Sequence, residues 1–260
     1  MSKKQQDNLS IKNELIFDKM VESTTCEIHM GQYPIFCLTT QKPDDTRLVF
    51  KESTTIASAQ VMKEWIVQVT SHYGWPGEHE AEVWRAIQHL AELRARDGCL
   101  TNPIVTTLEE IRRHMSHTSK GGRQWKQLVW SLSCLRNTIL ETNFWYHADI
   151  KIHKHASFSL ISSLSWSFKD LPNETRIIDQ IFISFGPEFF RNLKENYVRP
   201  LDKGFRDQTL KRWLSKRLYE ILGLKFYALR GRDVPYKIRY SRLCHLLGTK
   251  PQQYLSLIHI

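Results

Sequence analysis

The chain has 260 residues, of which 41% are hydrophobic, 25% charged and 11% aromatic. This composition supports a buried core and argues against wholesale disorder. No apolar run approaches the roughly 18 residues that a membrane helix needs, and the opening MSKKQQDNLSIKNEL lacks the hydrophobic stretch of a secretory signal. The five cysteines form no CxxC pair, which disfavours a disulfide framework or a structural zinc site. We therefore expect a soluble cytoplasmic protein without a membrane partner.

The formal net charge is +10, and it is unevenly distributed. Residues 198–260 hold 14 Lys and Arg against 4 Asp and Glu, whereas residues 1–197 are balanced at 23 against 23. A smaller excess, 8 basic against 3 acidic residues, lies between Glu110 and His155. Two basic zones favour a polyanion such as nucleic acid as the partner. The alternative is a surface charge that only keeps the protein soluble.

Residues 1–72 predict an N-terminal extension that is β-rich and partly disordered. Within it, residues 23–56 predict short β-segments broken by Pro34 and Pro43. A first helix is expected after the turn-like YGWPG at 73–77, with apolar residues at helical spacing from Val83 to Leu93 and Gly98 as its C-cap.

A short strand is expected over residues 103–106, followed by a second helix. Thr107 and Glu110 form a capping-box pattern, in which each side chain satisfies an amide donor near the other. Leu108, Ile111 and Met115 give this helix its buried stripe.

A third helix is predicted after the polar turn HTSKGG at 117–122. Its apolar face contains Trp125, Leu128, Val129, Leu132 and Leu135. The opposite face carries Arg123, Lys126, Gln127, Trp130 and Asn137. The periodicity therefore leaves Trp130 exposed, where it meets solvent or another segment.

Two β-prone runs, 139–147 and 158–166, follow the third helix and are joined by a loop containing Lys151, Lys154 and His155. Helix, strand, helix, turn, helix and hairpin is the element order of a winged helix. We assign residues 73–172 to a first winged-helix domain with this basic hairpin as its wing.

The same order is expected to begin again over residues 173–254. A strand at 177–186, a short helix from Pro187 and an amphipathic helix over 207–226 are followed by a strand at 236–240 and a helix at 241–248. Pro251 is placed to begin a second recognition helix. This second domain is expected to be incomplete, because only LSLIHI remains after residue 254. Those six residues can be encoded by the end of a transposase sequencing adapter, so we expect 255–260 to be an artefact; the alternative is a natural apolar tail.

The segment KGGRQWKQL at 120–128 contains the principal candidate site. Two glycines permit a tight turn against a phosphate, and the amide groups at a helix start favour an anion. Arg123, Gln124, Lys126 and Gln127 are side chains suited to base edges and phosphates. A nucleotide-binding loop is disfavoured because the GxxxxGK[ST] order is absent.

Enzymatic and metal-dependent alternatives find little support in the sequence. His153 and His155 form half of a metal site without a third ligand nearby. His29 lacks the second histidine that a rolling-circle initiator needs, and RYSRLCHLLG at 239–248 is not accompanied by the His-x-x-Arg of a tyrosine recombinase. We expect no catalytic residue, no metal ligand and no cofactor.

Several spaced features resemble the plasmid replication initiator protein A family, which is related in plan to plasmid initiators with two winged helices. These features are YGWP before the first helix, GGRQW followed by leucines at helical spacing, the strand-like FSLISSLSW, and LDKGFRDQTLKRWLSKRLYEILGLKFY at 201–227. The resemblance covers residues 73–254; the first 70 residues match poorly, and Trp125 stands where the family pattern has a tyrosine. It implies a non-enzymatic protein that binds repeated double-stranded sites at a replication origin, helps to open adjacent DNA, and recruits the host replication initiator and replicative helicase. A homodimer is among the assemblies it implies.

The sequence thus predicts an α+β fold of two tandem winged-helix domains, the second truncated before its recognition helix. A transcription regulator is the alternative function, and a divergent relaxase or recombinase is the enzymatic one. The predicted DNA-binding residues are Arg112, Arg113, Lys120, Arg123, Gln124, Lys126, Gln127, Lys151, Lys154, His155, Lys211, Arg212, Lys216 and Lys250.

Overall fold

The computed structural model describes residues 23–38, 45–56, 59–115, 122–170, 176–195, 197–228 and 235–249. The helices are α2 (Ile28–Gln32), α3 (Glu78–Arg96), α4 (Leu108–His114), α5 (Gly122–Arg136), α6 (Pro187–Lys194), the π-helix η1 (Phe205–Thr209), α7 (Trp213–Ala228) and α8 (Tyr240–Leu247). The strands are β1 (Ser23–Glu27), β2 (Arg47–Ile56), β3 (Ala59–Val69), β4 (Ile104–Thr106), β5 (Thr138–His147), β6 (Ile152–Ser159), β7 (Ile161–Asp170), β8 (Arg176–Phe185) and β9 (Val198–Asp202). None of the helices in these ranges has the length and apolar character that crossing a membrane requires.

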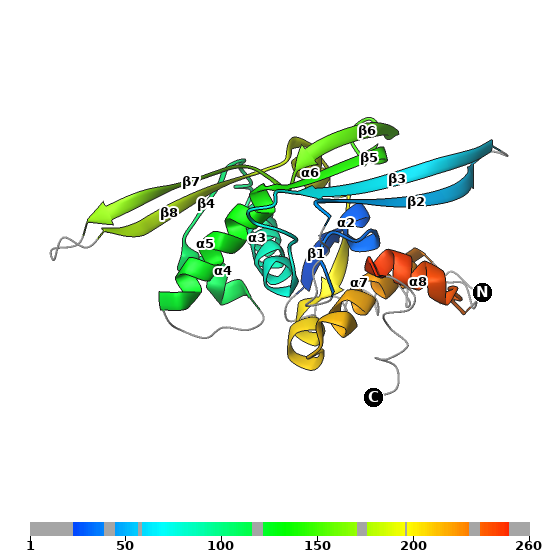
Figure 1. Ribbon diagram of the computed structural model, residues 1–260. Coiled ribbons are helices and arrows are strands. Elements are labelled where there is room, and N and C mark those ends of the chain that lie inside the picture. Colours follow the sequence, from blue (N-terminus) through cyan, green and yellow to red (C-terminus); the bar gives the residue numbers. More distant parts are fainter. Residues whose placement is uncertain are drawn as a thin grey trace, which may run out of the picture.

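The fold is mixed α/β, with three antiparallel sheets around a central helix, α3. The sheets have the strand orders β2-β3-β5-β6, β4-β8-β7 and β1-β9. The β7–β8 and β2–β3 hairpins project to opposite sides of the molecule, and α3, α4 and α5 lie beneath the base of β7–β8 (Figure 1). Helices α7 and α8 lie below the β2–β3 side.

Helix α3 begins and ends as its sequence predicts. At its start, the amide of Gly77 donates to the Glu80 carboxylate over 2.8 Å. At its end, Gly98 has a positive φ of 69°, a backbone conformation that glycine adopts without strain. The amide of Cys99 then donates to the carbonyl of Arg94 over 2.7 Å, which completes a Schellman C-cap. The predicted role of Gly98 is confirmed.

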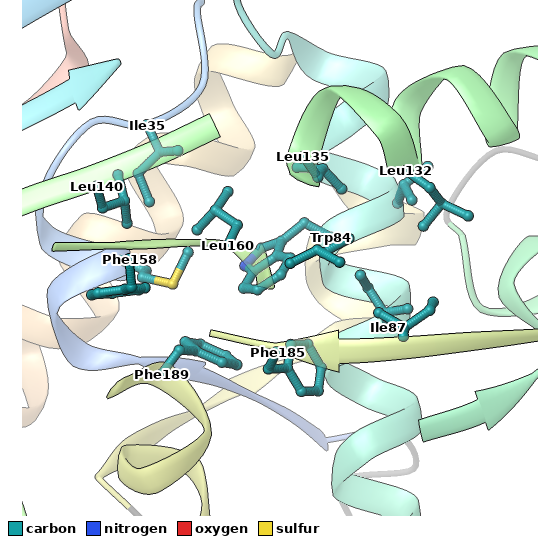
Figure 2. Packing of buried hydrophobic residues seen from close by; sticks show 14 of the residues in the cluster. Ile35, Trp84, Ile87, Leu132, Leu135, Leu140, Phe158, Leu160, Phe185 and Phe189 are labelled. Atoms are coloured by element: carbon teal, nitrogen blue, oxygen red, sulfur yellow. The ribbon is translucent and has the colours of Figure 1, made fainter. Parts of the chain in front are cut away.

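The main core forms where α3 and α5 meet the bases of the two larger sheets (Figure 2). The Trp84 ring lies 4.9 Å from that of Phe189 and 5.6 Å from that of Phe185, measured between centroids. Leu132 and Leu135 of α5 reach the same cluster, and both side chains are buried. The leucine stripe of α5 is therefore held against α3 by the burial of apolar surface.

The polar side of α3 is also buried, beneath η1 and α7. Arg85 donates two hydrogen bonds to the Glu220 carboxylate, from Nε over 3.0 Å and from Nη2 over 2.8 Å. Arg206 donates to Glu220 over 3.1 Å and to Glu82 over 3.1 Å. Lys216 lies 3.2 Å from Glu82. These five side chains, together with Arg217, form what we call the ion cluster.

Arg217 extends the ion cluster to the N-terminal segment. Its guanidinium donates to the carbonyls of Gly31 and Tyr33, each over 2.9 Å. Arg85 donates to the sulfur of Cys26 over 3.2 Å. Burial raises the pKa of the Cys26 thiol to about 11, so the sulfur is neutral at physiological pH. The ion cluster therefore joins α3, η1, α7 and the segment around α2 into one packed unit.

The structure corrects the predicted wing and the predicted domain boundary. Residues 139–147 and 158–166 do not form one hairpin, because β5 pairs with β6, and β6 ends at Ser159. After Leu160 the chain changes sheet, and β7 pairs with β8, which also pairs with β4. The β-prone sequence at 158–166 gives no sign of this change of partner. A boundary between residues 172 and 173 is wrong, because it divides the β7–β8 hairpin.

Some of the remaining predicted elements are confirmed, and others are wrong or lie outside the described residues. The predicted strand at 103–106, the helix from Pro187 and the helix at 241–248 are confirmed as β4, α6 and α8. The N-terminal region contains the long β2–β3 hairpin in place of the short segments expected there. Residues 236–239 do not form a strand, and Tyr240 already begins α8. Residues 1–22, the expected second recognition helix from Pro251 and the residues 255–260 lie outside the described ranges.

Removing the shared carboxylate should strongly destabilise the fold. We predict that Glu220→Ala lowers the free energy of unfolding by about 3–5 kcal/mol, because it leaves buried guanidinium groups uncompensated. Urea unfolding measures this change. Asp170→Ala is the matched control, since its ion pair with Arg176 is exposed and should contribute less than about 1 kcal/mol. Equal losses in the two variants would contradict the role of the ion cluster.

The same carboxylate should make stability depend on acid pH. Burial alone would raise the pKa of Glu220, but Arg85, Arg206 and Arg217 lower it to about 2. Its contribution is therefore complete above the unfolded-state pKa, about 4.3, and is lost as the pH falls towards the folded-state value. We predict that the stability difference between the natural chain and Glu220→Gln shrinks between about pH 6 and about pH 3 in urea unfolding. A difference that stays constant would refute this.

Candidate nucleic-acid interface

Helix α5 begins at Gly122 and presents its polar side to solvent, as predicted. Arg123, Lys126 and Gln127 are exposed, whereas Gln124 is half-buried. We refer to Arg123, Lys126 and Gln127 as the α5 polar face. It faces outward because the leucines on the opposite side of the helix pack against the core. The predicted amphipathic orientation of this helix is confirmed.

Helix α4, which precedes α5, contributes one well-exposed cation. Thr107 caps α4 as predicted, since its hydroxyl accepts from the amide of Glu110 over 3.0 Å. In a full capping box the Glu110 carboxylate would accept from the amide of Thr107. Here it accepts instead from the hydroxyl of Thr106 over 2.7 Å. The Arg113 side chain is 65% exposed, whereas that of Arg112 is 13% exposed and donates to Glu109 over 2.8 Å. Arg113 is therefore the better placed of the two for an external anion.

The basic residues of the β5–β6 hairpin are exposed, but they do not flank α5. Lys151, Lys154 and His155 belong to a hairpin whose turn packs on α6, where the amide of Ala148 donates to Asn192 over 3.3 Å. Figure 1 shows this hairpin on the opposite side of the sheet region from the first turn of α5. The prediction that these residues form the wing beside α5 is wrong, because the strand pairing places β7–β8 there instead.

The C-terminal basic zone divides into exposed and buried residues. Lys211 and Arg212 are exposed immediately before α7. Lys216 is 0% exposed and paired with Glu82, so its prediction as a DNA contact is wrong. Helical periodicity placed it on a polar face, but that face is covered by α3. Lys120 and Lys250 lie outside the described residues.

A groove of about 910 Å³ lies beside the α5 polar face. Its walls come from the start of α4, from α5 and from the β7–β8 hairpin. Six aromatic or cationic side chains line it: Tyr73, Trp125, Trp130, Trp166, Lys126 and Arg176. The Trp125 side chain is only half-buried in this groove, although its place on the apolar face of the helix predicts full burial in the core. Sequence reasoning missed the groove because it depends on the long-range pairing of β7 with β8.

Trp130 is 45% exposed, which confirms the expectation from its position on α5. The segment that it meets is the turn after β3, where its ring lies 4.9 Å from that of Tyr73 and 5.5 Å from that of His72, centroid to centroid. Within the described part of the chain, no three His, Cys, Asp or Glu side chains are grouped as metal ligands. His153 contacts the ring of Tyr146, and His155 lies 3.5 Å from Glu141.

Comparison with known proteins defines the class of this chain as a replication initiator. The family model "Replication initiator protein A" matches residues 27–232. The chain belongs to the replication initiator protein A family.

Two individual matches were found. The chain is 24% identical over 216 residues to a "Putative replication protein" of Wigglesworthia glossinidia brevipalpis, covering 82% of this chain and 72% of that protein. It is also similar to a solved structure, "Crystal structure of the RctB domains 2-3", with a TM-score of 0.42 and 12% identity, over 84% of this chain and 78% of the other.

Proposed function

We propose that this protein initiates plasmid replication by binding repeated double-stranded sites at an origin through the α5 polar face. Family membership supports the role in initiation. The single observation that carries the DNA contact is the outward orientation of Arg123, Lys126 and Gln127 on a helix whose other side is fixed in the core. These side chains can donate hydrogen bonds to the base edges of guanine and adenine and to phosphate oxygens.

The element order supports a winged-helix reading of the first unit. Helix α3, strand β4, helices α4 and α5, and the β7–β8 hairpin come in this order along the chain, with β5 and β6 between α5 and β7. Strand β8 pairs with both β4 and β7. In such units the third helix enters the major groove. On this reading β7–β8 is the wing, and the β5–β6 hairpin is an insertion that pairs with β3 of the N-terminal hairpin.

A second contact with the duplex is proposed for the C-terminal part of the chain. Lys211 and Arg212 are exposed just before α7. The ion cluster joins α7 to α3, so this second contact keeps a constant position relative to α5. The protein then acts without catalysing a reaction: it binds the repeats, promotes opening of adjacent DNA and recruits the host initiator and helicase, as the family implies.

The role of Arg123 can be tested on an origin-repeat duplex of the kind that this proposal requires. We predict that Arg123→Ala weakens binding to a repeat duplex by about 1–3 kcal/mol and relaxes the preference at one base pair, because a guanidinium contact to a base edge is lost. Fluorescence anisotropy with a set of single-base variants of the repeat measures both effects. Arg47→Ala, which removes an exposed cation from β2, is the control and should bind normally. An equal loss on every sequence would reduce Arg123 to a backbone contact.

The affinity for a repeat should also depend steeply on salt. With about six to ten phosphate contacts, counterion release predicts a loss of roughly a thousandfold or more between about 50 and 200 mM salt. Anisotropy titrations at several salt concentrations give the slope. A nearly salt-independent affinity would rule out a duplex contact of this size.

A further inference from the structure

The groove beside α5 has aliphatic walls that face solvent. Leu108 of α4, Val129 of α5 and two isoleucines of β8, Ile177 and Ile178, supply these walls. Ile177 is 41% exposed and Trp130, at the same groove, is 45% exposed. A contiguous apolar patch on the surface of a folded domain marks a place where a partner binds. The groove is therefore a candidate docking site.

The aromatic side of the groove is held in place. The rings of Tyr73 and His72 lie 4.9 Å and 5.5 Å from that of Trp130, centroid to centroid. Gly74, with a φ of 65°, permits the turn that carries them. Trp166, on the opposite wall, also packs against the main core. Side chains that are already fixed lose little conformational entropy when a ligand binds, which favours affinity.

The charges of the groove are few. Two cations, Lys126 and Arg176, line it together with one carboxylate, that of Glu109. Arg176 also pairs with Asp170 over 2.9 Å. A strand of nucleic acid brings a negative charge with every nucleotide and no aliphatic side chains to cover the walls. The groove therefore suits a ligand with aliphatic side chains and a small number of negative charges.

An amphipathic peptide has both of these features. In helix-in-groove recognition, apolar side chains spaced three and four residues apart fill an apolar groove. Exposed tryptophan and tyrosine are the residue types that concentrate binding energy at protein interfaces. Acidic side chains of the peptide are complementary to the charge of Lys126. The volume of about 910 Å³ is at the upper end of the range for ligand pockets, which leaves room for several side chains.

We propose that the groove between α5 and the β7–β8 hairpin is the docking site for an acidic amphipathic peptide segment of a partner protein. Trp130 and Ile177 contact the apolar side chains of the peptide, and Lys126 contacts its carboxylates. Lys126 also belongs to the α5 polar face, so a bound peptide occupies part of the proposed duplex contact. The peptide and the duplex therefore exclude each other, and this part of the inference rests on the proposed function. A partner that uses the groove releases the protein from DNA.

The apolar contact is tested with a fluorescent synthetic peptide of about 12 residues, roughly three helical turns. Leucine, tryptophan and phenylalanine stand at helical spacing on one side of it, with aspartate and glutamate on the other. We expect saturable binding in anisotropy titrations, and about tenfold weaker binding to Ile177→Ser because buried apolar area is lost. Ile177→Val should bind nearly as the natural chain does. Val61→Ser is the matched control, since Val61 is 38% exposed on β3, and it should leave the affinity unchanged.

A second peptide, with lysine in place of every acidic residue, tests the charge. The natural chain should bind it several-fold more weakly than the acidic peptide, and Lys126→Glu should reverse this order. Equal affinities for the two peptides in the natural chain would contradict the proposal. Binding of an oligothymidylate that Ile177→Ser loses, without any binding of the acidic peptide, would assign the groove to single-stranded nucleic acid and overturn the proposal.

Duplex measurements distinguish failure of this inference from failure of the proposed function. With the acidic peptide at about ten times its dissociation constant, the apparent affinity for the repeat duplex should fall about tenfold. Arg123→Ala should lose duplex affinity and still bind the peptide. A chain that binds the duplex but not the peptide, or both at once, would refute the inference alone. Peptide binding without any duplex binding would count against the proposed function. Circular dichroism melting of each variant shows that it is folded.

Discussion

The structure depends on a helix that is buried on every side. Residues 81–92 of α3 are all buried, including charged residues such as Glu82 and Arg85. Buried charges are tolerated only when they are paired and hydrogen-bonded. The ion cluster meets this requirement, because Glu220 of α7 accepts from the guanidinium groups of Arg85 and Arg206. The helix that supports α5 on its apolar side therefore also fixes η1 and α7 on its polar side.

This arrangement links the core to the proposed DNA contacts. The leucines of α5 pack on the apolar side of α3, which turns Arg123, Lys126 and Gln127 outward. The ion cluster holds the start of α7, with Lys211 and Arg212 exposed, on the other side. Two cationic elements from distant parts of the sequence are thus carried by a single buried helix. An elongated duplex with repeated sites is a ligand that such an arrangement suits.

Local patterns predicted the local structure well and the long-range pairing poorly. The Gly98 cap, the Thr107 cap and the amphipathic α5 follow from short-range spacing, and the structure confirms each of them. Strand partners depend on contacts between residues far apart in the chain. The spacing predicts a hairpin of 139–147 with 158–166, whereas β5 pairs with β6 and β7 pairs with β8. Likewise, a polar helical face has the same sequence pattern whether it meets water or a buried partner, so the pattern alone predicts an exposed Lys216, which is in fact buried.

The basic residues of the C-terminal zone therefore have two different roles. Arg206, Lys216 and Arg217 neutralise carboxylates inside the protein, and only the remaining exposed cations are available to a polyanion.

The most direct test of the interface is site-specific photocrosslinking to origin-repeat duplex, with the photoreactive amino acid at position 127 of α5 or at position 154 of β6. We expect efficient crosslinks from position 127 and few from position 154. Crosslinks from position 154 without any from position 127 would contradict a duplex contact through α5.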